Sequence, residues 1–142
     1  MKVIFIVISV FFALVILHKI RAAKRKKSVI YYCRYNGGFE KMYPEIIQGL
    51  KDDIRGGEII EKNEYSVTIS NEYRNHRYFF EQLYGGGLLI RYDKEPFNIG
   101  SIHENAIRKL WTFRDDTPAN QILMKIKTDL AMATLKNFLT DC

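Results

Sequence analysis

The first part of the chain is apolar at almost every position, whereas the remainder alternates between apolar and polar residues. From Val3 to Ile20 the only polar side chains are Ser9, His18 and Lys19. As a helix, these 18 residues would rise about 27 Å, close to the roughly 30 Å of a bilayer's hydrocarbon core. The pattern therefore predicts a transmembrane anchor at residues 1–20.

A secretory signal peptide and a buried core helix are the alternatives for this segment. A signal peptide needs small residues at its cleavage site, but the only small pair, Ala22-Ala23, lies between Arg21 and Lys24. A soluble domain rarely needs a helix that is apolar on every side. We therefore expect an uncleaved transmembrane helix.

Basic residues crowd the C-terminal flank of the apolar run. They are Lys19, Arg21, Lys24, Arg25, Lys26 and Lys27, whereas the N-terminal flank has Lys2. Because cytoplasmic flanks carry the excess of Lys and Arg, we expect a single-pass protein with its N-terminus outside and its C-terminal domain in the cytoplasm. Residues 21–27 would form a basic juxtamembrane segment, and the six basic residues would contact the anionic membrane surface.

The pattern of residues 28–142 predicts one cytoplasmic α+β domain. Ser28–Tyr35 is rich in β-branched and aromatic residues, so we expect a strand there. Phe39–Arg55 carries one apolar stripe at helical spacing, which predicts a helix. Glu58–Ser70 alternates as a strand does, and Lys62–Glu64 is a candidate hairpin turn.

The later segments are partly ambiguous. Asn71–Tyr84 fits a helix slightly better than a strand, although a hairpin through Gly85–Gly87 stays open as an alternative. Gly87–Asp93 is a continuous apolar run typical of a central strand. We expect a capped helix over Ser101–Phe113. A last helix over Pro118–Thr140 has so wide an apolar surface that we expect it at the centre of the core rather than at an oligomer contact.

These elements add up to one transmembrane helix followed by a sheet of three to four strands packed with three or four helices. The formal net charge of +6 at first suggests nucleic-acid binding. However, seven of the 22 Lys and Arg lie in residues 1–27, which leaves 15 against 16 acidic residues and a balance of −1 for residues 28–142. A phosphate-binding surface needs concentrated basic charge, so we expect no nucleic-acid partner.

Residue types that carry catalysis or bind metals are few. His76 and His103 are the histidines outside the apolar run, and nothing in the sequence brings either one to a carboxylate. Cys33 and Cys142 do not have the spacing of a zinc site or a disulfide framework. We therefore expect neither a cofactor nor a metal.

Tyrosine and arginine, which are enriched at protein interfaces, recur in the predicted strands. Tyr32, Arg34, Arg91 and Tyr92 are candidates for a partner-binding face on an open side of the sheet. We expect a membrane-tethered, non-enzymatic binding or accessory protein, such as a subunit of a membrane complex or an immunity-type binder. Its partners would be the lipid bilayer and a protein. The alternative is a small membrane-bound enzyme with a His/carboxylate acid–base site.

Overall fold

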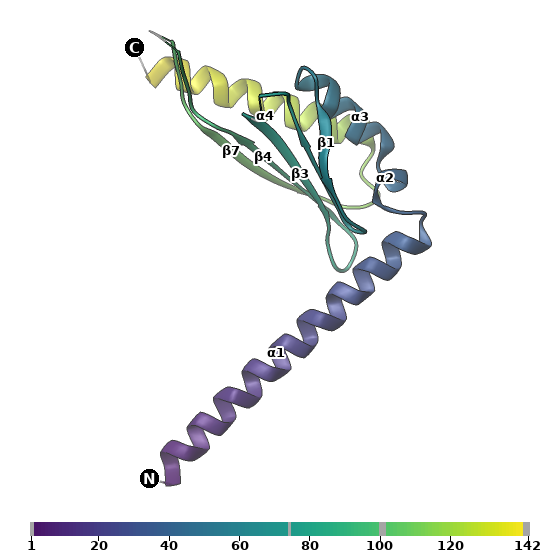
Figure 1. Cartoon of the computed structure of the whole chain (residues 1–142), viewed down its shortest axis with the longest axis vertical. Coiled ribbons are helices and arrows are strands. Elements are labelled where there is room, and N and C mark those ends of the chain that lie inside the picture. The colour runs from purple at the N-terminus through teal and green to yellow at the C-terminus, as the bar shows by residue number, and fades with distance from the viewer. Residues whose placement is uncertain (1, 74, 100–101, 141–142) are drawn as a thin grey trace.

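A long N-terminal helix leads into a small α+β domain (Figure 1). The computed structural model describes residues 2–73, 75–99 and 102–140. Helix α1 runs over Lys2–Tyr35, and its N-terminal part stands clear of the domain. Among the described residues, one helix, over Ile6–Tyr35, has the length and the apolar composition to cross a membrane.

The strand expected at Ser28–Tyr35 is wrong, because α1 continues through this segment. A helix that has already been nucleated gains one hydrogen bond for each added residue, and this gain outweighs the local β preference. The helix ends at Tyr35, and Gly37, two residues later, has a φ of 85°. The Gly37 amide donates to the Arg34 carbonyl and the Gly38 amide to the Cys33 carbonyl, which is a Schellman motif.

The helix expected at Phe39–Arg55 is present, but it is split into α2 (Phe39–Met42) and α3 (Pro44–Asp53). Pro44 causes the break, because the residue before a proline is disfavoured in the α-helical region. Tyr43 accordingly has φ −131° and ψ 44°.

Five strands form one antiparallel sheet in the order β1-β2-β3-β4-β7. Their bounds are β1 Glu58–Lys62, β2 Ser66–Ser70, β3 His76–Gln82, β4 Leu88–Lys94 and β7 Ile107–Phe113. The hairpin turn after Lys62 and the central strand over residues 88–94 confirm the sequence predictions. The sheet has more strands than expected because two predicted helices are strands.

The helix favoured at Asn71–Tyr84 is wrong, and the alternative hairpin through Gly85–Gly87 is confirmed. Tyr78, Phe80 and Gln82 point inward on β3 and are at most 2 % exposed. This alternation has the period of two that a half-buried strand requires.

The helix expected over residues 101–113 is also wrong. Residues 102–113 form β6 (Ile102–Glu104), which pairs with β5 (Phe97–Ile99), and then β7. The proposed cap at Ser101 lies outside the described residues. Ile107 and Trp111 are both buried, and their four-residue separation fits one face of a helix as well as one face of a strand. Pairing with the free edge of β4 selects the strand.

The last predicted helix is present as α4 (Ala119–Thr140), which begins one residue after the predicted first position, Pro118. Together with α3 it covers one face of the sheet, as Figure 1 shows. Ile122 and Ile126 are buried in the core, but Met132 and Leu135 are more than half exposed. The expectation that α4 lies at the centre of the core therefore holds only for its first half.

Candidate functional site

A polar network surrounds the place where α1 joins the domain. We call this place the junction and define it as residues Arg25–Tyr35 of α1 with the side chains they contact. Val29 and Cys33 lie one helical turn apart on α1, and both are buried in the hydrophobic core. Helix α1, which is apolar near its N-terminus, thus also contributes residues to the core of the domain. No flexible linker separates the two parts.

Asp115, in the loop between β7 and α4, is the acceptor at the centre of the junction. Tyr43 donates from its hydroxyl across 2.7 Å to Asp115 Oδ1 and lies 2.6 Å from Gln82 Oε1. Because a hydroxyl has one hydrogen, Tyr43 donates to one of these two acceptors at a time. Gln82 Nε2 donates to both carboxylate oxygens, at 3.0 and 3.2 Å. Tyr32 of α1 donates to Asp115 Oδ2 across 3.3 Å.

Burial raises the pKa of Tyr43 well above its ordinary value, and the hydrogen bond to Asp115 raises it further. The Tyr43 hydroxyl is therefore a hydrogen-bond donor at physiological pH, not a base. Its role in this geometry is to hold the loop that carries Asp115 against the end of α1.

Two cations of the basic segment lie over tyrosine rings at the adjacent end of the sheet. The Arg25 guanidinium carbon is 5.6 Å from the ring centre of Tyr84, beside the β3–β4 turn. The Lys26 ammonium is 5.5 Å from the ring centre of Tyr65, in the β1–β2 turn. Such contacts contribute about 0.5–1 kcal/mol each at exposed sites. They join α1 to two hairpins at the same end of the sheet.

An open cavity of about 400 Å³ lies between α1 and the β3–β4 turn. Ser28, Tyr32, Tyr84, Gly86 and Asp115 are among its lining residues. A side chain at Gly86 would place its Cβ 3.1 Å from Asp115 Oδ2, so glycine keeps this end of the cavity accessible. The cavity has a mixed polar and apolar lining, and its walls include side chains that fix α1.

The six basic residues predicted to contact the membrane surface are all exposed along α1: Lys19, Arg21, Lys24, Arg25, Lys26 and Lys27. They are in helical conformation, so residues 21–27 continue the helix. Their contact with lipid stays a prediction.

The four residues proposed as one partner-binding face lie in different places. Tyr32 and Arg34 are on α1, where Arg34 pairs with Glu64. Arg91 and Tyr92 are neighbours on β4 and therefore point to opposite faces. Arg91 is on the uncovered face, whereas Tyr92 is only 5 % exposed on the face that α3 and α4 cover. The structure does not bring the four together on one surface.

The sequence did not single out most of the uncovered sheet face, which we call the open face. Its members follow from the cross-strand register: Glu61, Thr68, Phe79, Arg91 and Leu110 in one row, Glu58, Ser70, Arg77, Asp93 and Arg108 in a second, and Ser66, Glu81, Leu89 and Thr112 in a third. The Arg91 guanidinium lies 5.1 Å from the ring centre of Phe79. Asp93 accepts from Arg91 at 2.9 Å and from Arg108 at 3.0 Å. Strict alternation along β3 and β4 was the signal that would have found these residues.

His76, one of the two histidines considered for acid–base chemistry, lies at the start of β3, with its Nδ1 2.5 Å from the Tyr92 hydroxyl. The side chain of His103 lies outside the described residues. Within the described parts of the chain, no group of three or more His, Cys, Asp or Glu side chains is placed to hold a metal ion. The His/carboxylate site stays a prediction.

Comparison of the chain with protein-family models, with curated proteins and with solved structures finds no match.

Proposed function

We propose that this protein is a membrane-tethered binding or accessory protein whose α+β domain works at the cytoplasmic surface of the membrane. The observation that carries the proposal is the continuity of α1. Its apolar segment is exposed on all sides, and the same helix enters the domain core at Val29 and Cys33. Exposed apolar surface of this extent is stable in lipid rather than in water.

The basic segment supports the orientation. Six cations follow the apolar run within one helical stretch, and such an excess marks the cytoplasmic flank. Cys33 is a free, buried thiol, as suits a reducing compartment. In this orientation the N-terminus is outside and the domain is inside.

Tethering gives a small domain a function without catalysis. Holding the domain next to a membrane partner raises its effective concentration there without adding contacts. A subunit of a membrane complex and an immunity-type binder both use this principle. The rigid junction adds a fixed orientation, so that one surface of the domain is always presented to the partner.

Topology is tested by labelling one engineered cysteine. Met124 is 67 % exposed on α4, so Met124→Cys in a Cys142→Ser background gives a reactive thiol on the domain, while Cys33 is shielded in the core. We expect a membrane-impermeant maleimide to label this thiol only after the cells are permeabilised. Labelling in intact cells would refute the cytoplasmic placement.

Partner binding is tested by affinity capture from solubilised membranes, with the full chain compared with a version that lacks residues 1–27. This version keeps every member of the hydrophobic core, the first of which is Val29. We expect one specific membrane partner, recovered more strongly by the full chain. Equal recovery by both versions, or no specific partner with either, counts against the tethering proposal.

A further inference from the structure

Strand β7 forms one of the two outer edges of the sheet, and within residues 2–73, 75–99 and 102–140 no strand lies beside its outer edge. In an antiparallel strand, alternate residues direct their N–H and C=O groups away from the neighbour that is already paired. β7 pairs with β4 through seven consecutive residues without a shift in register, so its outer edge is regular. A regular edge of this kind is a template for a further strand.

The other outer edge, β1, carries features that prevent such pairing. Its register with β2 shifts between Ile59 and Glu61, as at a β-bulge. Glu58 and Lys62 add charges at its two ends. Bulges and charged side chains are common means of blocking an edge strand. The two edges of the sheet therefore differ, and β7 is the one that can accept a partner strand.

The charges on β7 are balanced within the chain. Arg108 Nε, on the open face, lies 3.0 Å from Asp93 Oδ1. Lys109, on the covered face, lines an open groove of about 590 Å³ together with Asp129 of α4. Leu110, at the midpoint of the strand, is apolar and 61 % exposed. β7 thus combines unpaired backbone groups with an apolar centre.

The second half of α4, which the core does not bury, lies beside the same edge. Leu123 and Lys127 lie against α3 on one flank of the helix. Met132 comes nine residues after Leu123, about two and a half helical turns, so it points to the opposite flank. Met132 and Leu135 are apolar residues that line the groove with Lys109. The groove therefore opens on the side of α4 away from α3, next to β7.

Pairing of β7 with β7 of a second copy fits these features. Opposite residues of antiparallel strands point to the same face, so the two-fold axis passes through one residue of the strand. An axis through Leu110 is the one that pairs all seven residues. It sets Lys109 opposite Trp111 of the second copy, and the indole N–H of Trp111 donates to the Asp129 carboxylate. An axis through Arg108 or Lys109 would instead place like charges directly opposite each other, which is destabilising.

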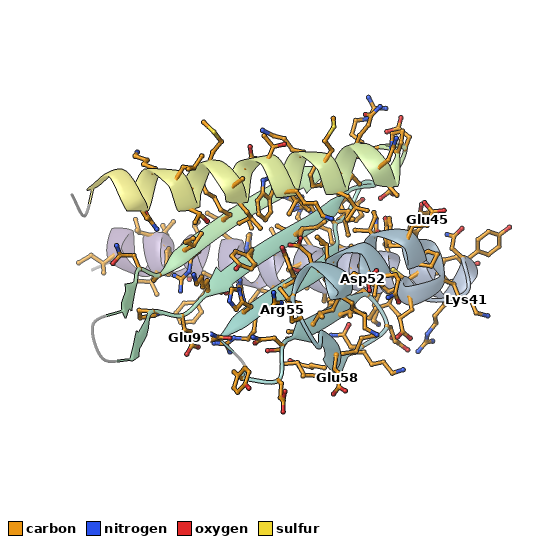
Figure 2. The ribbon with its side chains drawn as sticks, turned by 90° about the horizontal axis from the view of Figure 1, so that it is seen from above. Lys41, Glu45, Asp52, Arg55, Glu58 and Glu95 are labelled. Carbon is orange, nitrogen blue, oxygen red and sulfur yellow. The ribbon has the colours of Figure 1, made fainter. Side chains whose placement is uncertain are left out.

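The direction of α1 is compatible with this symmetry. In Figure 1 the strands run across the axis of α1, and α3 and α4 lie on the side of the sheet farther from the N-terminus of α1. Seen from above in Figure 2, α3 and α4 lie over the sheet and α1 passes beneath it. A two-fold axis perpendicular to the sheet keeps both α1 helices on one side, so both apolar segments enter the same bilayer. A dimer through the two open faces would point them in opposite directions.

We propose that β7 is an interface between two copies of this chain, which pair antiparallel about a two-fold axis through Leu110 and join two five-stranded sheets into one. This inference rests on the proposed function, because it requires both α1 helices to span one membrane. Confinement to that membrane raises the effective concentration of the copies, so a contact made of one strand edge and the adjoining grooves is sufficient. In dilute detergent, where this confinement is lost, we expect a monomer.

Cysteine cross-linking of the full chain in phosphatidylcholine vesicles tests the register. Opposite residues of antiparallel strands have Cα atoms about 4.5–5.5 Å apart, which is within the range of about 4.4–6.8 Å of a disulfide. Leu110→Cys places two such residues on the axis, whereas the two copies of Thr112→Cys, on the same face, would lie about 14 Å apart. Both variants carry Cys142→Ser, and Cys33 is buried. We expect an added oxidant to link Leu110→Cys several-fold faster than Thr112→Cys.

Equal rates at the two positions, or no disulfide at either, would overturn the inference. A Leu110→Cys thiol that stays unlinked but is shielded from a water-soluble maleimide in native membranes would also overturn it, because a different protein would then cover the edge.

Leu110→Lys gives a second readout that needs no cross-link. It sets like charges opposite each other on the axis, so most of the dimer should be lost. The dimer fraction is counted from photobleaching steps of protein labelled at Met124→Cys in the same vesicles. Because Leu110 is exposed, its replacement should leave the midpoint of urea unfolding in detergent unchanged. A dimer that survives Leu110→Lys would refute pairing through β7.

A separate measurement keeps this inference distinct from the proposed function. Flotation of the vesicles after an alkaline wash reports whether α1 is inserted. Insertion together with equal cross-linking at positions 110 and 112 refutes only the dimer. Loss of the protein from the floated vesicles refutes the membrane tether itself.

Discussion

Replacing Asp115 with alanine should destabilise the domain by about 2–4 kcal/mol, because one carboxylate serves three side chains from three elements. Gln82 is 2 % exposed, so its amide cannot recover the lost acceptor from water. A buried donor without a partner costs about 1–3 kcal/mol, and the hydrogen bond from Tyr43 to a charged acceptor adds a comparable amount. Part of the loss is recovered because the Tyr43 hydroxyl keeps Gln82 Oε1, 2.6 Å away.

The assay is urea unfolding of the full chain in nonionic detergent, followed through the fluorescence of Trp111, the only tryptophan. Asp116→Ala is the matched control. It removes the neighbouring carboxylate, which is exposed and paired with Arg114, and should cost less than about 0.5 kcal/mol. If Asp115→Ala costs no more than the control, the network does not hold the junction. When Asp115→Ala is combined with Tyr43→Phe, we expect a coupling energy of about 1 kcal/mol, because the two residues are in contact.

Three further predictions test the core and its buried polar groups. Ile126→Ala, at a fully buried position on α4, should cost about 2–4 kcal/mol, whereas Met132→Ala, at an exposed position on the same helix, should stay within about 0.5 kcal/mol in the same urea assay. Burial raises the folded-state pKa of both Tyr43 and Tyr78, so the folded state keeps protons that the unfolded state releases above pH of about 10. Stability should therefore be unaffected below that pH and fall as the pH rises above it, and Tyr78→Phe should make the fall less steep. Cys33 is fully buried, so a maleimide should modify it at the rate of unfolding; fast modification of the native protein, measured by mass spectrometry, would contradict the described packing.

The elements that sequence reasoning placed correctly are those with one dominant local signal. The apolar run over Val3–Ile20 and the helix start near Pro118 carry such a signal, and the structure has helices over Lys2–Tyr35 and Ala119–Thr140. The strand over Leu88–Lys94 was also predicted, from its apolar run. In these cases tertiary contacts and local preference agree.

The errors occur where two periodicities share the same residues. Tyr73, Arg77, Phe80 and Tyr84 fit a helical stripe, yet Tyr78 and Phe80 are the ones that point into the core, two residues apart on β3. Pairing with β4 selects strands over helices for both segments, because the two edges of β4 need hydrogen-bonding partners and β3 and β7 supply them. A local pattern cannot include this requirement of a neighbouring strand.

The polar site was beyond local reasoning for a different reason. Tyr32 and Asp115 are 83 residues apart in sequence and meet only because α1 continues past the apolar run. The prediction of a strand at residues 28–35 removed that possibility. By contrast, the proposal that Arg91 and Tyr92 share one face could have been rejected from the sequence, since neighbouring residues of a strand point to opposite sides.

The continuity of α1 also changes what the basic segment does. If residues 21–27 were a flexible linker, they would anchor the domain and leave its orientation free. As part of one helix that ends in a Schellman motif at Gly37, they fix the sheet at a set angle and height above the apolar run. Lys26 and Arg25 then hold Tyr65 and Tyr84, and with them one end of the sheet, at a fixed distance from the apolar run. The position and the orientation of the domain relative to the apolar run thus follow from the same helix.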